Sequence, residues 1–239
     1  MTSVCIIQSN YVPWKGYFDL IGTCDWFVVY DEVQFTKNDW RNRNLIKTPA
    51  GLQWLSIPVG SNIRRRICDV ELSDPSWRSR HWKTLQAAYG RAPFARQMLG
   101  LLEPVYLGPP HRTLSELNID LIRMICRRLG IATRIVDSRS LAAPEGKTER
   151  LVHICSDLGA TRYVSGPAAK EYLDGAQFNE RGIAVDWFDY SGYPEYPQLW
   201  GGFEHGVSIL DLLFNCWEDS RRYMKFPDLR AAAERRSAA

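Results

Sequence analysis

"SVCIIQSNYVPWKGYF", residues 3–18, is the stretch that decides the fold. Residues 3–8 form a short, mostly apolar run that predicts a buried strand, and the apolar residues between 15 and 24 recur at near-helical spacing. A run rich in β-branched and aromatic residues follows at 25–35, so residues 3–35 predict a strand–helix–strand unit. The loop between the first strand and the helix is where open α/β sheets bind ligands.

The next segments predict a hairpin and then a helical region. Residues 42–60 contain two alternating runs on either side of a Pro-Ala-Gly turn at 49–51. The middle third, residues 76–130, has helical periodicity. Its last helix carries apolar residues on one stripe, with Ser115 as the expected N-terminal cap and Gly130 as the stop.

Strands and helices alternate again after residue 130. The pattern predicts strands at 131–138, 162–166 and 183–190, and helices at 148–160, 167–174 and 208–224. We therefore expect an α/β fold with a mostly parallel sheet, flanking helices and a helical insertion in the middle third. The expected organisation is a single α/β domain at 1–227, with the insertion at about 76–130 and a frayed C-terminal tail at 228–239.

The composition is that of an ordinary globular chain of 239 residues with a formal net charge of +3. This charge gives no indication of nucleic-acid binding, and the apolar runs are shorter than the roughly 20 residues of a membrane span. "MTSVCIIQSN" lacks the basic start and long apolar stretch of a signal peptide, so we expect a cytoplasmic protein. The six cysteines are scattered singly, without zinc-site spacing, so we expect no metal, and we expect no cofactor.

Polar and aromatic side chains surround the first strand–helix turn. They are Gln8, Asn10, Tyr11, Trp14 and Tyr17. In one interpretation, proline and glycine shape the turn while the aromatic rings fill the core. In the other, the cluster lines a pocket where backbone N–H groups at the helix start meet an anion.

The densest polar stretch, "DEVQFTKNDWRNRNLIKT", covers residues 31–48. Arginine forks suit phosphates and carboxylates, and in an extended segment Arg41 and Arg43 point to the same face. The alternative is a solvated hairpin edge protected by charge. The run "RRR" at 64–66 is interpreted as charged surface. The candidate binding residues of the polar stretch are Asp31, Gln34, Lys37, Asn38, Arg41, Asn42, Arg43 and Lys47.

"YVSGPAAKEYL", residues 163–173, places Ser165 and Gly166 at a strand end, before a helix that carries Lys170. This geometry suits an anion or a ligand carboxylate. It is not the GxSxG nucleophile elbow, because Tyr163 stands where that motif needs glycine.

"FEHGVSILDLLFN", residues 203–215, contains the acid–base candidate. Ser208 and Asp211 fit an S-x-x-D capping box, which accounts for both without a further role. His205 lies in the loop before that cap, and an imidazole with a pKa of about 6.5 suits acid–base or binding chemistry. Asp31, at a strand end, is the reserve candidate for the same role.

Four segments together resemble the WbqC-like family: "IIQSNYVPWKGYFDLI", "FVVYDEVQFTKNDWRNRNLIKTPAG", "TERLVHICSDLGATRYVSGPAAKEYLD" and "YPQLWGGFEHGVSILDLLFNC". The resemblance covers nearly the whole chain and implies a bacterial protein associated with gene clusters for O-antigen, other surface glycans or specialised metabolites. Family members tend to have a glycine soon after the position of Asn215, where this chain has Cys216 and Trp217. The matched residues are Gln8, Tyr11, Pro13, Trp14, Gly16, Tyr17, Asp31, Gln34, Trp40, Asn42, Arg43, Lys47, Ser165, Gly166, Lys170, Tyr172, Gln198, Ser208 and Asp211.

A fainter resemblance is to nucleotidyltransferases of the HxGH type, which place a strand, a proline loop, H-x-G-H and a helix at the chain start. The stretch Trp14-Lys15-Gly16-Tyr17 occupies that place here. Aromatic rings therefore replace both imidazoles that stabilise the transferring phosphoryl group. The replacement argues against the same chemistry and leaves open a site of nucleotide size.

From the family resemblance and the basic, asparagine-rich stretch at 31–48, we expect a transferase that moves an acyl or aminoacyl group to an activated amino-sugar. Its partner is a small anionic substrate, a nucleotide-sugar or an acyl donor. The alternatives are a non-catalytic binding or scaffold protein of the same pathway and a nucleotidyltransferase-like enzyme. His205 and Asp31 are the catalytic candidates. The substrate-binding candidates are Gln8, Tyr11, Trp14, Tyr17, Gln34, Asn38, Arg41, Asn42, Arg43, Lys47, Ser165, Gly166, Lys170 and Gln198.

Overall fold

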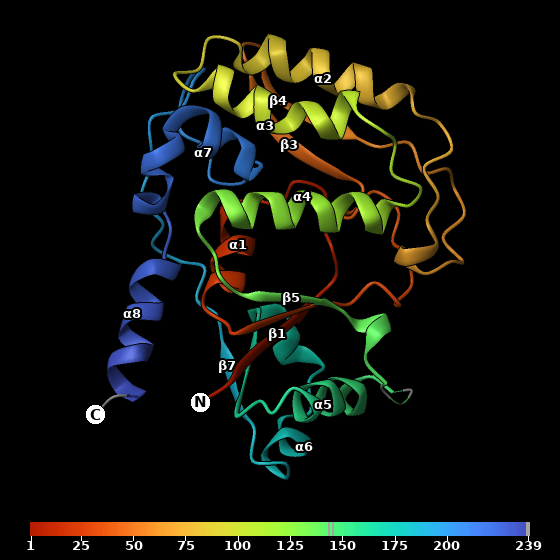
Figure 1. The fold of residues 1–239 in the computed structure, drawn as a ribbon, viewed down its shortest axis with the longest axis vertical. Helices are drawn as coiled ribbons and strands as arrows, with labels where there is room; N and C mark the ends of the chain where they lie inside the picture. The colour runs from red at the N-terminus through yellow and green to blue at the C-terminus, as the bar shows by residue number, and fades with distance from the viewer. Residues whose placement is uncertain (143, 145, 238–239) are drawn as a thin grey trace.

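The computed structural model describes residues 1–142, 144 and 146–237 (Figure 1). In this part of the chain, five parallel strands form the central sheet, in the order β5-β2-β1-β6-β7. The predicted α/β fold with a parallel sheet and flanking helices is thus confirmed. The strands are β1 (Ser3–Ile7), β2 (Trp26–Val29), β5 (Arg134–Asp137), β6 (Arg162–Ser165) and β7 (Ala184–Trp187).

Alternate side chains of the central strands enter two different apolar clusters. Cys5 and Phe27 belong to the larger cluster, together with residues of α1, α4 and α7. Val4 and Val28 belong to the smaller cluster, with residues of α5 and α6. This two-residue period makes the sheet the middle of three layers, with α4 and α5 on opposite sides of it (Figure 1). The helices are α1 (Lys15–Gly22), α4 (Leu114–Leu129), α5 (Thr148–Asp157), α6 (Gly175–Asn179) and α7 (Ile209–Cys216).

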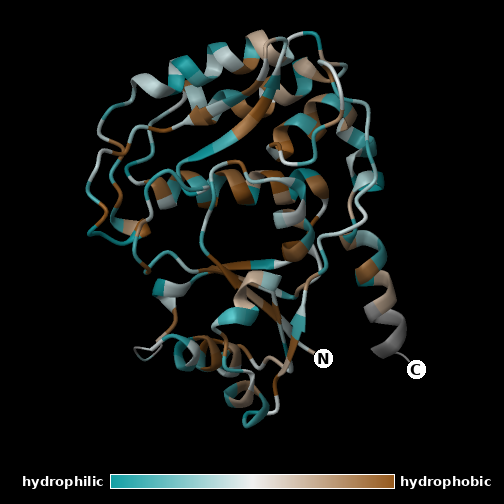
Figure 2. Cartoon of the chain, turned by 180° about the vertical axis from the view of Figure 1, so that it is seen from behind, coloured by the Kyte–Doolittle hydropathy of each residue, from teal (hydrophilic) through white to brown (hydrophobic). Residues whose placement is uncertain are grey.

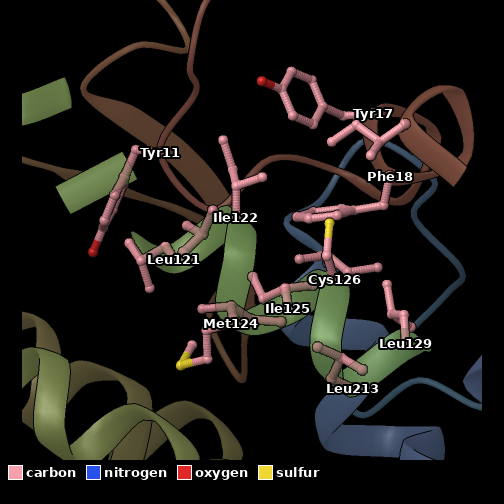
Figure 3. Packing of buried hydrophobic residues seen from close by; sticks show 14 of the residues in the cluster. Tyr11, Tyr17, Phe18, Leu121, Ile122, Met124, Ile125, Cys126, Leu129 and Leu213 are labelled. Carbon is pink, nitrogen blue, oxygen red and sulfur yellow. The ribbon is translucent and has the colours of Figure 1, made fainter. Parts of the chain in front are cut away.

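Helix α4 is the central helix of the larger cluster. In Figure 3 its Cys126 points toward the ring of Phe18 from α1. The predicted stop is confirmed, since Gly130 ends the helix with a left-handed φ of 68°. The predicted cap at Ser115 is wrong, because Thr113, two residues earlier, is the N-cap and forms a capping box with Glu116.

The helices predicted for the middle third are present as α2 (Ser76–Tyr89), α3 (Ala95–Leu107) and α4. Helices α2 and α3 contact each other, and α2 also contacts the predicted hairpin, formed by β3 (Arg43–Thr48) and β4 (Gly51–Ser56). Helix α4 shares a cluster with the sheet instead, so it acts as the crossover between β2 and β5. The division into one domain with a tail stays a prediction.

Two predicted elements differ from the structure in length or winding. The predicted strand at 25–35 ends at Val29, because the chain turns where the polar stretch begins. The predicted helix at 167–174 is a short 3-10 helix, η3 (Pro167–Glu171), since Asp174 caps the next helix instead of continuing this one. Two further single turns are η1 (Ile67–Asp69) and η2 (Ser138–Ser140).

The predicted helix at 208–224 is split. It forms α7 and then the 3-10 helix η4 (Trp217–Tyr223). After it, the segment expected to fray forms α8 (Phe226–Ser237). The start of α8 is fixed by Asp19 of α1, whose Oδ1 accepts hydrogen bonds from the backbone amides of Lys225 and Phe226 at 2.8 and 2.7 Å.

Hydropathy follows these layers. Figure 2 shows hydrophobic residues along parts of the central strands and on the helices that pack against them, with hydrophilic residues alternating along these helices. Among the described residues, no helix has the length and apolar character needed to cross a membrane.

Candidate functional site

The sheet order reverses direction at β1. Strands β2 and β5 lie on one side of β1, and β6 and β7 lie on the other. In an open parallel sheet, ligands bind outside the carboxyl ends of the strands at such a point. Gln8 follows β1 and Gly166 follows β6, and both are half-buried. We therefore build the candidate site from these two strand ends.

A hydrogen-bonded cluster joins the first turn to the polar stretch. The Arg41 guanidinium donates to Oδ1 of Asn10 and, at 3.3 Å, to Oε1 of Gln8. The carboxylate of Asp39 lies 3.8 Å away. The two amide oxygens orient the guanidinium without neutralising its charge, because they are neutral acceptors. The Arg41 side chain is 16% exposed, so an incoming anion can reach it.

Asp31 is fully buried at the end of β2. Its Oδ1 accepts from the Ser9 backbone amide at 2.8 Å, and its Oδ2 accepts from the hydroxyls of Ser9 at 2.7 Å and Ser115 at 2.5 Å. Burial raises the pKa of Asp31, and these hydrogen bonds act against that rise. The carboxylate therefore ties the ends of β1 and β2 to α4 and positions the loop that carries Gln8 and Asn10.

The turn before α1 contains a strained residue. Val12 has a φ of 38°, which a β-branched residue rarely adopts. The Nδ2 of Asn44 donates to the Val12 carbonyl at 3.1 Å, and the hydroxyl of Ser208 donates to it at 2.6 Å. Backbone strain of this kind is concentrated at ligand sites and persists only where the surroundings hold it. Here the hairpin and the cap of α7 both hold the turn.

An aromatic contact connects α1 to the ends of β6 and β7. The Trp14 ring lies 5.4 Å from the ring of Tyr190, and a Cβ on Gly166 would lie 3.6 Å from that tyrosine. Gly16 permits this arrangement, since a Cβ there would be 2.3 Å from the Trp14 ring. The sequence pattern missed Tyr190, which ended a predicted strand and carried no motif.

The hairpin presents an exposed aromatic surface, formed by Trp40, Trp54 and Arg43. The two tryptophans are 44% and 40% exposed, and their ring centroids are 5.6 Å apart. The Arg43 guanidinium lies over Trp54, with Cζ 4.2 Å from the ring centroid. Its Nε is buried and has no hydrogen-bond partner among the described residues. We refer to these three side chains as the tryptophan shelf.

The buried Lys47 meets the partly exposed Gln198. The Lys47 ammonium donates to Oε1 of Gln198 at 2.9 Å and to the Gly202 carbonyl. Close by, buried Asp211 accepts from the hydroxyls of Tyr89 at 2.8 Å and Tyr196 at 2.9 Å, and burial raises the pKa of Asp211. This arrangement holds the long loop before α7 against the hairpin.

Lys15, in the first turn of α1, was not among the predicted residues. Its Nζ donates to the Pro194 carbonyl at 3.0 Å and lies 4.8 and 5.0 Å from the ring centroids of Tyr193 and Tyr196. Burial lowers the pKa of Lys15 to about 8, so this amine loses its proton far more readily than an ordinary lysine. Its position within the W-K-G-Y stretch could have marked it.

Tyr11 points into the protein. Its hydroxyl lies 2.9 Å from Nδ1 of His81 and 2.5 Å from the Tyr106 hydroxyl. The other histidine nitrogen, Nε2, lies 3.2 Å from the Ser56 carbonyl, which can only accept, so Nε2 carries the proton. Burial lowers the pKa of His81 to about 4, so the imidazole is neutral at neutral pH.

Three more predicted residues have little contact with solvent. Two of them form hydrogen bonds to backbone carbonyls, and the third lies at a strand end. The Tyr17 hydroxyl donates to the Gln8 carbonyl at 2.9 Å, and Nδ2 of Asn42 donates to the Ile57 carbonyl at 2.9 Å. Ser165 ends β6 and is 6% exposed. Because they are buried, we assign these side chains to holding the site in place rather than to ligand contact.

Four predicted residues are exposed and lie outside the Arg41 cluster. Gln34 lines a groove with the arginines at 64–66, and Asn38 has a left-handed φ of 59°. Lys170 lies over the Trp187 ring at 5.5 Å. His205 contacts the Phe203 ring, with centroids 4.6 Å apart.

The half-exposed side chains define what the site can bind. Guanidinium and amide groups suit an anion, and the indole rings suit a flat or ring-shaped moiety. Within the described residues, no group of three His, Cys, Asp or Glu side chains is placed to hold a metal ion. The candidate residues that are neither buried nor fully exposed are Gln8, Asn10, Trp14, Arg41, Arg43, Gly166 and Gln198.

Comparison with known proteins agrees with the resemblance seen in the motifs. A model of the WbqC-like protein family matches residues 8–223. An uncharacterized protein of Mycobacterium tuberculosis (strain ATCC 25618 / H37Rv), Rv1507c, is 47% identical over 228 residues, which are 95% of this chain and 99% of that protein. No solved structure matches the chain significantly.

Proposed function

Since this chain belongs to the WbqC-like protein family, we propose that it is a transferase of surface-glycan or specialised-metabolite biosynthesis. The reaction we propose is transfer of an acyl or aminoacyl group to an activated amino-sugar. In that reaction the amine attacks the acyl carbonyl, the bond to the donor's leaving group breaks, and the amine loses a proton.

One observation carries the proposal. Arg41 stands at the carboxyl end of β1, oriented by two neutral amides and accessible to solvent. A nucleotide-sugar offers a diphosphate, which the fork of an arginine binds through paired charge-assisted hydrogen bonds. Trp14, at the start of α1, and the tryptophan shelf are the aromatic groups on which we propose that a sugar or a base stacks.

We divide the candidate residues into those that contact the substrate and those that position the surrounding loops. Arg41 and Arg43 are proposed to contact the anion, and His205, which is exposed, is the proposed base for the amine proton. Asp31 keeps its place as the reserve base, although its hydrogen bonds fit a positioning residue better. The buried Tyr11 and Lys47 are proposed to act by holding the loops.

A second candidate function is a nucleotidyltransferase-like enzyme. The observation that favours it is the central position of β1 at the reversal of the sheet, followed after a short loop by the W-K-G-Y stretch that begins α1. Lys15, with its pKa lowered to about 8, is the charged group of that turn.

The deciding experiment is incubation with nucleotide-amino sugars and acyl thioesters, read by mass spectrometry. A product heavier than the amino sugar by the acyl group supports the transferase, whereas release of pyrophosphate from a nucleoside triphosphate and a sugar phosphate supports the second candidate. Saturable binding with no donor consumed contradicts both and supports the scaffold reading. Arg41→Gln should lose the activity, while Arg222→Gln, an exposed arginine paired with Asp219, is the matched control.

A further inference from the structure

A groove of about 350 Å³ is lined by Gln34, Arg64, Arg65 and Arg66. It is a shallow, open depression, which can receive a charged group without enclosing a whole ligand. The sequence pattern of three consecutive arginines had indicated ordinary charged surface. The structure instead gathers all three around one depression, with the polar side chain of Gln34 beside them.

The backbone that carries these arginines is fixed. The Phe35 amide donates to the Arg65 carbonyl at 2.8 Å, and the Ile67 amide donates to the Val33 carbonyl at 3.0 Å. Gln34 and Arg66 form an antiparallel bridge between the same two segments. A further bond, from the Cys68 amide to the Asp31 carbonyl at 2.9 Å, joins this pair to the end of β2. The groove is therefore built on paired backbone.

The positive charge of the groove exceeds the negative charge near it. Arg66 pairs with Asp69 through Nε at 2.7 Å and Nη2 at 3.1 Å. Glu32, the other carboxylate that acts on Arg66, is itself paired with Arg150 at 2.5 Å. Within the described residues no ion pair is formed by Arg64 or Arg65.

Arg65 has unused hydrogen-bonding capacity. Its Nη2 donates to the Val59 carbonyl, a neutral acceptor, and its guanidinium lies 5.8 Å from the Phe35 ring centroid. Its Nε is buried and lacks a hydrogen-bond partner among the described residues.

We propose that this groove binds the phosphate groups of a small phosphorylated compound. Three guanidinium groups with one paired carboxylate suit a ligand that carries several negative charges, and arginine forks match the geometry of phosphate oxygens. The groove is made by the segments after β2 and before η1, whereas Arg41 reaches the end of β1. It is thus a second anion site, which does not depend on the transferase reaction.

The test uses the full chain and isothermal titration with pyrophosphate and with a nucleoside diphosphate. Arg64→Gln should weaken binding by about fivefold and Arg64→Gln with Arg66→Gln by about twentyfold, at an unchanged melting temperature. Arg222→Gln, the matched control, should change affinity by less than about twofold. Affinity should fall as salt rises.

Two results would overturn the proposal: absence of saturable pyrophosphate binding, or an equal loss of affinity in the Arg222 control. If Arg64→Gln weakens the binding of pyrophosphate and of the nucleoside diphosphate by the same factor, the groove binds the phosphates of a nucleotide. If Arg64→Gln weakens the binding of pyrophosphate only, the groove binds free diphosphate or a diphosphate attached to a group other than a nucleoside. Arg41→Gln separates this site from the proposed active site. It should abolish any binding at the end of β1 and leave the component of pyrophosphate binding that Arg64→Gln weakens within about twofold.

Discussion

Ser9 donates both its backbone amide and its hydroxyl to the carboxylate of Asp31, at 2.8 and 2.7 Å. These two bonds connect the residue two places beyond β1 with the residue two places beyond β2, inside the protein. The loop between β1 and α1 can therefore keep its shape only while that carboxylate is in place.

Replacing Asp31 by alanine should destabilise the protein. The change leaves the Ser9 amide and the hydroxyls of Ser9 and Ser115 without their acceptor, at a cost of about 1–3 kcal/mol for each unpaired group. We expect a loss of at least about 3 kcal/mol in the free energy of unfolding, measured with urea. Asp31→Asn keeps one oxygen acceptor and should lose less. A folded, stable Asp31→Ala would contradict the positioning role.

Arg43→Ala tests the tryptophan shelf. A charge-assisted contact to an anion contributes roughly 1.5–3 kcal/mol, so its removal should weaken ligand binding at least about tenfold. The melting temperature should not change, because the guanidinium rests on an exposed ring. Titration calorimetry and thermal melting measure the two quantities. An equal fall in stability and affinity would mean that Arg43 is structural.

His205→Asn tests the proposed base. A positioned general base contributes roughly 10²–10⁴-fold in rate, and turnover should fall by that factor without unfolding. His153→Asn is the matched control, since His153 is also partly exposed and lies 3.3 Å from Asp157, one turn later on α5. Near-normal turnover in His205→Asn, together with an inactive Asp31→Asn, would assign the base to Asp31.

His81 should lower the free energy of unfolding as the pH falls below about 6.5. Its pKa is about 4 in the folded protein and about 6.5 in the unfolded chain, so the unfolded chain binds more protons between these values. The stability that His81 contributes is complete above pH 6.5 and is lost as the pH falls toward 4, by about 3 kcal/mol. In urea unfolding across this window, His81→Gln should lose less stability than the native chain. Parallel pH profiles would rule this out.

Asp19 should have the opposite effect. Burial raises its pKa to about 6 from 3.8, so the folded protein binds more protons between these values. Its ionisation costs stability that is regained as the pH falls through the window, again about 3 kcal/mol. Asp19→Asn keeps an oxygen for the amides of Lys225 and Phe226. Relative to the native chain it should be more stable at pH 8 than at pH 4, and the reverse order would exclude this account.

The strand–turn–helix at 3–18 and the hairpin were predictable because their signals are local. The order of the strands was not, since it depends on which face each crossover covers. The candidate site, too, could be predicted only as far as its signals are local in the sequence. Tyr11 was recognised as part of the first strand–helix turn and Lys47 as part of the polar stretch. Whether their polar atoms face solvent depends on His81 and Gln198, which lie far away in the sequence.

At Trp217, the position of an unusual helix end was predictable from the sequence, but its geometry was not. The absence of the glycine typical of the family left the end of that helix undefined. Trp217 has a φ of 35°, in the region that favours glycine. The Arg128 guanidinium lies 3.8 Å from its ring centroid, a contact that offsets part of the strain. No local pattern could have named Arg128 as the partner.

The central position of β1 also has a consequence during synthesis of the protein. Ser3 and Val4 pair with Arg162 and Tyr163, so one edge of β1 has no partner until β6 has left the ribosome. At roughly 5–20 residues per second, that delay is on the order of ten seconds. During it the nascent chain exposes an unpaired apolar strand, which other nascent chains can add to. Chaperones that bind extended apolar segments would then act first on β1.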